Sequence, residues 1–239
     1  MVDRRDQAMT AQDITVNDIG AATARLLIKS GAIQISRERP YVLAAGWASP
    51  VYVDCRLLIG EPQFRKEAVR LAAEAARSMI EPGSFDALAG AETAGIPFAS
   101  WLADVLDVPL RYVRKRPLGI GHNAQVEGGS VEGLRVLLVD DLTTDATSKV
   151  SFAHGLRQAG AVVTDVLTIF YHSAFPGARD RLAQTGLSLH PLATWDDVLR
   201  ADIGQFDPAD RRQIEDFLAD PVAWSTRHGG RSALQARKR

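Results

Sequence analysis

Short apolar runs alternate with segments of helical periodicity along most of this chain. The clearest run spans residues 136–139, where valine and leucine follow one another without interruption, as in a strand buried on both faces of a parallel sheet. By the same criteria we expect further strands at residues 85–90, 108–113 and 162–171, and a short edge strand at 187–192.

Apolar residues recur at helical spacing between these strands. The helices expected from this spacing cover residues 62–80, about 97–106, 148–158, 195–200 and 208–218. The alternation of strands and helices predicts an α/β fold whose mostly parallel central sheet is flanked by helices.

The chain ahead of the first of these helices has a different pattern. Residues 1–14 are expected to form a flexible leader, and a helix begins near Thr15 and ends at Gly31. Short strands are then expected at residues 32–35, 41–43 and 51–55. We interpret residues 15–60 as a small N-terminal hood that precedes the main sheet.

Length and composition narrow the class of protein. The 239 residues suit one domain, which we place at residues 15–220, followed by a basic, flexible tail at residues 221–239. The formal net charge of −1 predicts no nucleic-acid or membrane partner. A single cysteine, Cys55, cannot form an internal disulfide, and the first residues have no signal-peptide core, so we expect a cytoplasmic protein.

Two carboxylates, Asp140 and Asp141, follow the apolar run at residues 136–139, and a hydroxyl-rich turn then leads into a helix. Carboxyl ends of strands are where open α/β sheets bind ligands, and a helix N-terminus that presents N–H and hydroxyl groups suits a phosphate. The two carboxylates could accept hydrogen bonds from sugar hydroxyls or help to hold a divalent cation. The pattern therefore favours a phospho-sugar site.

Two other interpretations of the acidic pair remain open at this stage. The pair could simply cap the following helix. It could also belong to a receiver domain of a phosphorelay, although such a domain carries its acidic pair after the first strand, whereas about 130 residues precede this one.

A basic cluster follows the strand expected at residues 108–113, and it contains Arg111, Arg114, Lys115 and Arg116. The glycine-rich segment after it, residues 117–129, is typical of a mobile lid. Basic side chains at the base of a lid suit an anionic ligand, and a solvated charge run is the alternative.

Taken together, four motifs resemble one family. In chain order they are Ser49-Pro50-Val51-Tyr52-Val53-Asp54-Cys55-Arg56, Ala91-Glu92-Thr93-Ala94-Gly95-Ile96-Pro97, Tyr112-Val113-Arg114-Lys115 and Val139-Asp140-Asp141-Leu142-Thr143-Thr144. The chain thus resembles the orotate phosphoribosyltransferases, which are type I phosphoribosyltransferases, over roughly residues 15–220. The resemblance implies transfer of ribose 5-phosphate from phosphoribosyl pyrophosphate to orotate, with Mg²⁺, in a homodimer.

The resemblance also implies a role for each motif. Asp140 and Asp141 would hold the ribose hydroxyls with Mg²⁺ nearby, while Arg114 and Lys115 would bind pyrophosphate charge. The pyrophosphate loop would include Thr93, Ala94 and Gly95. The 5-phosphate cradle would comprise Thr143, Thr144, Asp145, Ala146, Thr147 and Ser148, and Thr144 would also touch orotate. His122 is the one side chain left in the lid that can carry a positive charge.

Five positions depart from the family pattern. Val42, Leu118 and Ile120 stand where this branch of the family has basic residues, and Asp145 and Ala146 stand in a phosphate turn that is otherwise rich in glycine. Asp145 is expected to place a carboxylate against a phosphate, and Ala146 carries a Cβ where positive φ would favour glycine. We therefore expect an orotate phosphoribosyltransferase with an altered site. A catalytically silent regulatory relative and a phosphoribosyltransferase for another base are the alternatives.

Overall fold

The computed structural model describes residues 16–43, 46–117, 125–201, 204 and 206–232. The predicted leader at residues 1–14 lies outside these ranges, as do the lid positions Leu118, Ile120 and His122. Among the helices within these ranges, none has the length and apolar character needed to cross a membrane.

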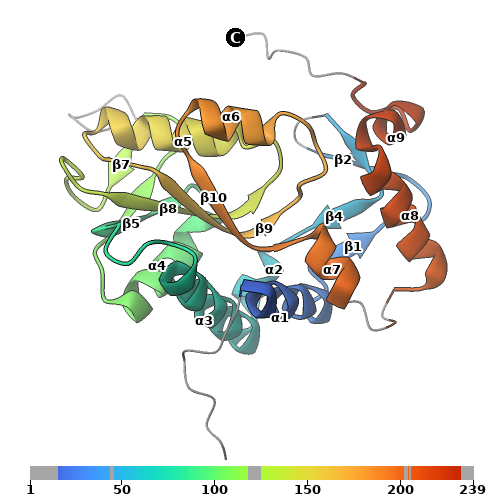
Figure 1. The fold of residues 1–239 in the computed structure, drawn as a ribbon, viewed down its shortest axis with the longest axis horizontal. Coiled ribbons are helices and arrows are strands. Elements are labelled where there is room, and N and C mark those ends of the chain that lie inside the picture. Colours follow the sequence, from blue (N-terminus) through green and yellow to red (C-terminus); the bar gives the residue numbers. More distant parts are fainter. Residues whose placement is uncertain (1–15, 44–45, 118–124, 202–203, 205, 233–239) are drawn as a thin grey trace, which may run out of the picture.

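A six-stranded sheet crosses the molecule, in the order β10-β9-β8-β5-β6-β7 (Figure 1). Its strands are β5 (Ala87–Ala91), β6 (Leu110–Val113), β7 (Val126–Glu127), β8 (Val136–Thr143), β9 (Asp165–Tyr171) and β10 (Ser188–Thr194). Neighbouring strands are parallel except β6 and β7, which are antiparallel. The mostly parallel sheet and the edge position of β10 are as predicted, and the continuous apolar run of residues 136–139 lies in β8, inside the sheet.

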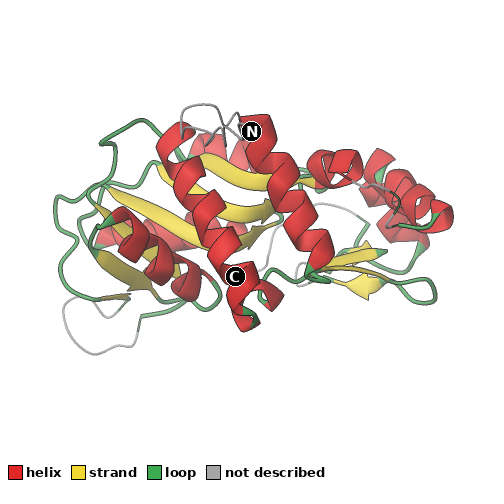
Figure 2. Ribbon diagram, turned by 90° about the horizontal axis from the view of Figure 1, so that it is seen from below, coloured by secondary structure: helices red, strands yellow, loops and turns green. Residues whose placement is uncertain are grey.

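Helices cover both faces of this sheet (Figures 1 and 2). They are α1 (Val16–Lys29), α2 (Leu57–Gly60), α3 (Pro62–Ser78), α4 (Gly95–Leu106), α5 (Thr147–Gln158), α6 (Ala178–Gln184), α7 (Trp195–Ala201), α8 (Pro208–Ala219) and α9 (Pro221–Arg227). Buried side chains of α5 and α6 pack together on one face of the sheet, whereas those of α1, α3, α4 and α7 form a larger core on the other.

The structure corrects the extent of the hood. Two short antiparallel pairs form it: β1 (Ile33–Ile35) with β4 (Val51–Val53), and β2 (Tyr41–Val42) with β3 (Ala48–Ser49). Helix α1 was predicted to belong to the hood, but it packs against α3, α7 and β10. The reason is its apolar stripe, since Ile19 and Leu27 are almost fully buried in the larger core.

The prediction of a flexible tail from residue 221 is wrong for its first part. Residues 221–227 form α9, which Asp220 caps by accepting a hydrogen bond from the Ala223 N–H at 2.9 Å. Trp224 is only 5% exposed and packs edge-on against the ring of Phe217. Burial of this large aromatic side chain stabilises the helix, and the basic composition that suggested disorder lies mostly beyond it.

Hydrogen bonds also fasten the end of α9 to the hood. The Ser225 hydroxyl accepts a hydrogen bond from the Ala48 N–H at 3.0 Å and donates one to the Arg231 carbonyl at 2.9 Å. The Arg231 N–H in turn donates to the Gly46 carbonyl at 2.8 Å. The C-terminal part of the described chain therefore completes the N-terminal hood, as the proximity of α9 and β2 in Figure 1 illustrates.

A buried histidine follows β9. His172 is 2% exposed, and its Nδ1 accepts a hydrogen bond from the Trp195 indole N–H at 3.2 Å. The rings of Trp195, Phe175 and Phe217 surround it. Burial lowers the pKa of His172 to about 4, so the imidazole is neutral in the folded protein near neutral pH.

We predict that the contribution of His172 to the free energy of unfolding falls as the pH drops from about 6.5 toward 4. In this range the unfolded chain binds a proton at His172 while the folded chain does not, because the folded pKa is about 4 and the ordinary value is 6.5. The full loss below pH 4 is about 3 kcal/mol. Urea unfolding at pH 8 and pH 5 measures this contribution: relative to the natural protein, His172→Phe should gain about 2 kcal/mol of stability between pH 8 and pH 5. The variant should also be about 1 kcal/mol less stable at pH 8, because the indole N–H loses its acceptor.

The control for this measurement is His154→Gln, which changes an exposed histidine on α5. It should retain the pH dependence of the natural protein. An unchanged pH dependence in His172→Phe would show that another group is responsible.

Candidate active site

The centre of the candidate site is the carboxyl end of β8. Residues 136–139 are at most 2% exposed, and the strand continues through both aspartates to Thr143. Asp140 is itself only 6% exposed, and Asp141 is half-buried. Because β8 lies between β5 and β9, its end is covered from both sides, and the two carboxylates are placed in the position where parallel sheets bind ligands.

Asp140 pairs with a lysine that the sequence analysis did not identify. Lys149 lies in the first turn of α5, and its ammonium donates to Asp140 Oδ2, to the Leu142 carbonyl at 2.6 Å and to Ser148 Oγ at 3.2 Å. The side chains of Lys149 and Asp140 are 3% and 9% exposed. The sequence does contain a signal for this pair: a lysine in the first turn of the helix that follows two aspartates can reach back to them, because that helix starts beside the end of β8.

Asp141 is in a different environment. Its Oδ1 accepts a hydrogen bond from the Leu142 N–H at 2.8 Å. Burial, and secondly the negative charge of Asp140, raise the pKa of Asp141 to about 7. Cys55, next to the hood strand β4, lies near this carboxylate. Burial, and secondly the negative charge of Asp141, raise the pKa of the Cys55 thiol. This thiol is 1% exposed, which suits a small buried side chain and not a nucleophile.

The turn between β8 and α5 contains both departures from the expected phosphate cradle. The side chain of Asp145 faces the start of the helix, where its Oδ1 accepts a hydrogen bond from the Thr147 N–H at 3.0 Å. The backbone carbonyl of Asp145 accepts a hydrogen bond from the Arg181 guanidinium. Asp145 thus occupies one N–H donor that a phosphate could use. Ala146 has φ 60° and ψ 5°, the left-handed conformation that the sequence suggested.

The burial of Ala146 explains why alanine is tolerated there. Left-handed backbone costs a residue with a Cβ about 1 kcal/mol. Ala146 is 2% exposed and packs in the smaller core, and burying one methyl group contributes about 0.8 kcal/mol. The two effects are of similar size and opposite sign, so the turn can form without glycine.

The remaining residues of the predicted cradle differ in accessibility. Thr143 is 1% exposed, and its carbonyl accepts a hydrogen bond from the His172 N–H, so its side chain belongs to the core. Thr144 and Thr147 are half-buried, and Ser148 is exposed. Thr144, Thr147 and Ser148 are therefore the hydroxyl side chains of this turn that a ligand could reach.

A second turn, between β5 and α4, abuts the acidic pair. A Cβ added to Gly95 would lie 3.0 Å from the Asp140 Cα and 3.1 Å from Asp140 Oδ1. Glycine is required here because the backbone of this turn touches the backbone of β8. Thr93 is exposed and Ala94 is half-buried beside it, and the peptide bond between Glu92 and Thr93 is cis.

In the basic cluster at residues 111–116, two arginines form hydrogen bonds with neighbouring protein groups and the other two basic side chains are exposed. Arg114 donates to Glu127 Oε1 at 3.0 Å and to the Tyr112 hydroxyl at 3.3 Å. Arg111 donates to the carbonyls of Leu110 and Ser130. These two arginines are held by neighbouring protein groups.

Lys115 and Arg116, by contrast, are exposed. The N–H of Lys115 donates to Glu92 Oε2 at 2.7 Å, which joins the end of β6 to the turn that carries Thr93. The cluster therefore reaches the second turn of the site. His122 lies outside the described residues, as does most of the predicted lid.

The described residues form no group of three or more His, Cys, Asp or Glu side chains that could hold a metal ion by themselves. At the acidic pair, both oxygens of Asp140 accept hydrogen bonds, from Lys149 and from the Asp141 N–H, so Asp141 is the better placed ligand. Mg²⁺ usually takes one or two carboxylates and fills its other positions with phosphate oxygens and water. The site therefore fits a Mg²⁺ ion that arrives with a phosphorylated ligand.

Comparisons with known proteins agree with this geometry. A family model described as a phosphoribosyl transferase domain matches residues 59–196. The orotate phosphoribosyltransferase of Cereibacter sphaeroides is 45% identical over 210 residues, which are 87% of this chain and 90% of that protein. The orotate phosphoribosyltransferase of Rhizobium rhizogenes is 42% identical over 228 residues, which are 95% of this chain and 97% of that protein.

Two solved structures are also similar. Orotate phosphoribosyltransferase from Aeropyrum pernix has a TM-score of 0.64 at 34% identity, over 74% of this chain and 96% of that one. UMP synthase from Leishmania donovani has a TM-score of 0.70 at 25% identity, over 83% of this chain. The matched part is 42% of that longer protein.

We predict that Asp141→Asn increases the free energy of unfolding by about 2 kcal/mol or more at pH 8 in the absence of ligands. The folded pKa of Asp141 is about 7 and the ordinary value is 3.8, so its charge destabilises the fold above pH 7. The gain should shrink as the pH falls from 7 toward 4, because the folded state then holds the proton. Urea unfolding at pH 8 and pH 5 measures this, with the exposed Asp216→Asn as control. A loss of stability at pH 8 would contradict it.

Proposed function

The chain belongs to the orotate phosphoribosyltransferases, and from this premise we propose how its own residues carry out the transfer. The substrates are phosphoribosyl pyrophosphate and orotate. A bond forms between N1 of orotate and C1′ of the ribose, the C1′–oxygen bond breaks, pyrophosphate leaves, and N1 gives up its proton. The products are orotidine 5′-phosphate and pyrophosphate.

The observation that carries this proposal is the contact of Gly95 with the backbone of β8 at Asp140. One substrate contains a ribose, a 5-phosphate and a pyrophosphate, so its three binding regions have to be adjacent. The Gly95 turn, the acidic pair and the N-terminus of α5 meet at this place. Their proximity supports a site for one such molecule.

Each region then has a distinct task. Asp141 accepts hydrogen bonds from the ribose hydroxyls, while Thr144, Thr147 and Ser148 donate to the 5-phosphate at the N-terminus of α5. The Gly95 turn presents backbone N–H groups to the pyrophosphate. Asp145 has to release the Thr147 N–H or share it with the phosphate, which is where this site departs most from the family pattern.

Catalysis in this scheme is mainly positioning and stabilisation of charge. The positive charge that develops on the ribose is close to the carboxylate of Asp141, and the exposed Lys115 is available to the leaving pyrophosphate. Arg114 contributes once it exchanges Glu127 for the substrate. Asp141 would hold the Mg²⁺ ion, which would neutralise part of the pyrophosphate charge. A buried free Cys55 fits the reducing environment of the cytoplasm, where we place the reaction.

The loss of orotate absorbance with phosphoribosyl pyrophosphate and Mg²⁺ measures this activity directly. We predict that the natural protein consumes orotate and that Gly95→Ala lowers kcat/KM by about a hundredfold, because the added Cβ pushes the pyrophosphate turn away from β8. The matched control is Gly60→Ala, since a Cβ at Gly60 meets no atom within 4 Å. Absence of turnover, or full activity of Gly95→Ala, would contradict the proposal.

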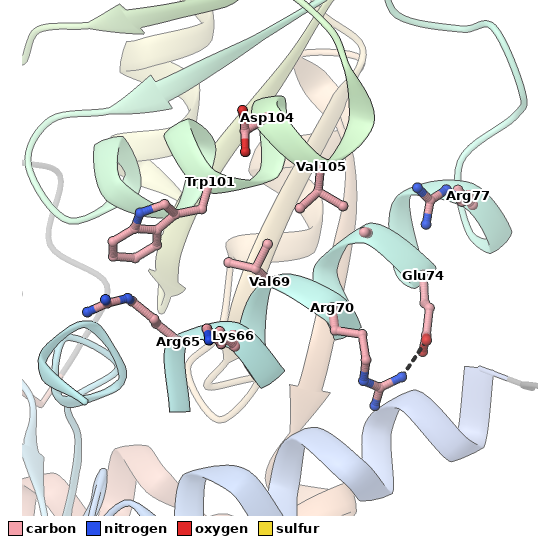
Figure 3. Close-up of a pocket in the computed structure, with 10 residues that line it drawn as sticks. Arg65, Lys66, Val69, Arg70, Glu74, Arg77, Trp101, Asp104 and Val105 are labelled. Atoms are coloured by element: carbon pink, nitrogen blue, oxygen red, sulfur yellow. Dashed lines mark hydrogen bonds and ion pairs between the residues drawn. The ribbon is translucent and has the colours of Figure 1, made fainter. Parts of the chain in front are cut away.

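We also propose a homodimer, and we assign its interface to a groove between α3 and α4 (Figure 3). The groove has a volume of about 530 Å³, and the exposed Val105 and the indole of Trp101 lie along one side of it. The guanidinium of Arg65 lies 5.5 Å from the Trp101 ring centre. The residues that line it are Arg65, Lys66, Val69, Arg70, Ala73, Glu74, Arg77, Trp101, Asp104 and Val105.

The chemistry of this groove suits a second copy of the same chain. It combines an apolar centre with charges of both signs, such as Arg77 and Asp104. A two-fold interface brings the same patch together with itself, so arginines of one copy can face carboxylates of the other.

We predict that Val105→Glu dissociates the dimer, because the substitution buries an unpaired charge at the interface. Light scattering after size exclusion should give twice 25.9 kDa for the natural protein and 25.9 kDa for the variant. Val162→Glu is the matched control, since Val162 is 51% exposed and Val105 is 48% exposed, and Val162 lies outside the groove. A dimeric Val105→Glu, or a monomeric natural protein, would exclude this interface.

A further inference from the structure

The ammonium of Lys149 lies at the junction of two ligand-binding regions. It bonds to Asp140 and to the Leu142 carbonyl at the end of β8, and to Ser148 Oγ at the start of α5. Its three N–H bonds have three acceptors, and its side chain is 3% exposed. Lys149 therefore does not extend toward a ligand but connects the strand that ends in the acidic pair with the helix whose N-terminus faces the phosphate.

This arrangement gives the carboxylates of Asp140 and Asp141 different hydrogen-bond donors. Oδ2 of Asp140 accepts from Lys149, and Oδ1 accepts from the Asp141 N–H at 2.9 Å. On the carboxylate of Asp141, Oδ1 accepts a hydrogen bond from the Leu142 N–H at 2.8 Å. Each oxygen of Asp140 thus has a protein donor, one of them the Lys149 ammonium, whereas Oδ2 of Asp141 is available to a sugar hydroxyl or a cation.

We propose that Lys149 is a positioning residue of the transfer reaction: it holds Asp140 as its counter-charge and so leaves Asp141 to meet the ribose and the cation. This inference rests on the proposed function. Asp140 and Asp141 stand close together, and phosphoribosyl pyrophosphate adds several negative charges to the same place. With Lys149 present, only one of the two carboxylates remains uncompensated when the substrate arrives.

A purely structural role would have different consequences. A buried ion pair can often be replaced by uncharged side chains with little effect on the fold, provided that both partners are replaced. If Lys149 acts through Asp140, removing the ammonium matters to ligands only while Asp140 keeps its charge. The charge of Asp140, once released, would also be free to bind a cation together with Asp141.

The test is a cycle of Lys149→Met, Asp140→Asn and the double variant, with two readouts. Calorimetry with phosphoribosyl pyrophosphate and Mg²⁺ should give at least about tenfold weaker binding for Lys149→Met, whereas the same change in the Asp140→Asn background should shift affinity by less than about twofold. Titration with Mn²⁺ alone should give at least about tenfold tighter binding to Lys149→Met than to the natural protein, and the double variant should lose this gain.

Lys29→Met is the control for net charge, because Lys29 is an exposed residue at the end of α1. It should change neither binding constant. If urea unfolding shows that Lys149→Met is not folded, the same measurements are made on Lys149→Gln, which removes the charge and keeps a donor for the Leu142 carbonyl.

Additive effects of Lys149→Met and Asp140→Asn on substrate affinity would overturn the inference, as would unchanged Mn²⁺ binding in a folded Lys149 variant. The Mn²⁺ titration needs no turnover. A failure of the proposed function, seen as absence of orotate consumption by the natural protein, is therefore distinguishable from a failure of this inference.

Discussion

The carboxylate of Asp140 ends a strand that is buried on both sides, and such a charge requires a counter-charge within the protein. Lys149 supplies it from the first turn of α5. The pairing fixes where α5 begins relative to β8, and hence where the N-terminus of α5 points. The phosphate turn, the half-buried Asp141 and the contact with the Gly95 turn all depend on this placement.

The same region combines stabilising and destabilising features. Asp141 has a pKa of about 7 because it is buried beside another carboxylate, which is unfavourable for the folded protein alone. Ala146 adopts a left-handed conformation, and Asp145 occupies an N–H at the helix start. Sites that bind several charges often contain such strain, since like charges and strained backbone are held there ready for the ligand. The larger core and the aromatic cluster around His172 offset these costs.

Much of the fold could be predicted from the sequence because its elements have distinct periodicities. The run at residues 136–139 identified the central strand, and α3 begins at the proline that the pattern suggested. The basic composition predicts flexibility from residue 221, but residues 221–227 form a helix because Trp224 is buried. Likewise, nothing in the periodicity of α1 says that it packs beside α3 and not in the hood.

The sequence by itself determined the family, the α/β architecture and the identity of the acidic pair, because these depend on motif order and local pattern. Only the tertiary structure decided which of the two aspartates is free, because Lys149 reaches Asp140 from a separate element across the turn. It also decided that Arg114 is held by Glu127 and that Thr143 faces the core. Residue type and spacing indicate which chemistry a side chain can perform. Its partners and its burial decide which role it has, and these arise from packing between distant segments.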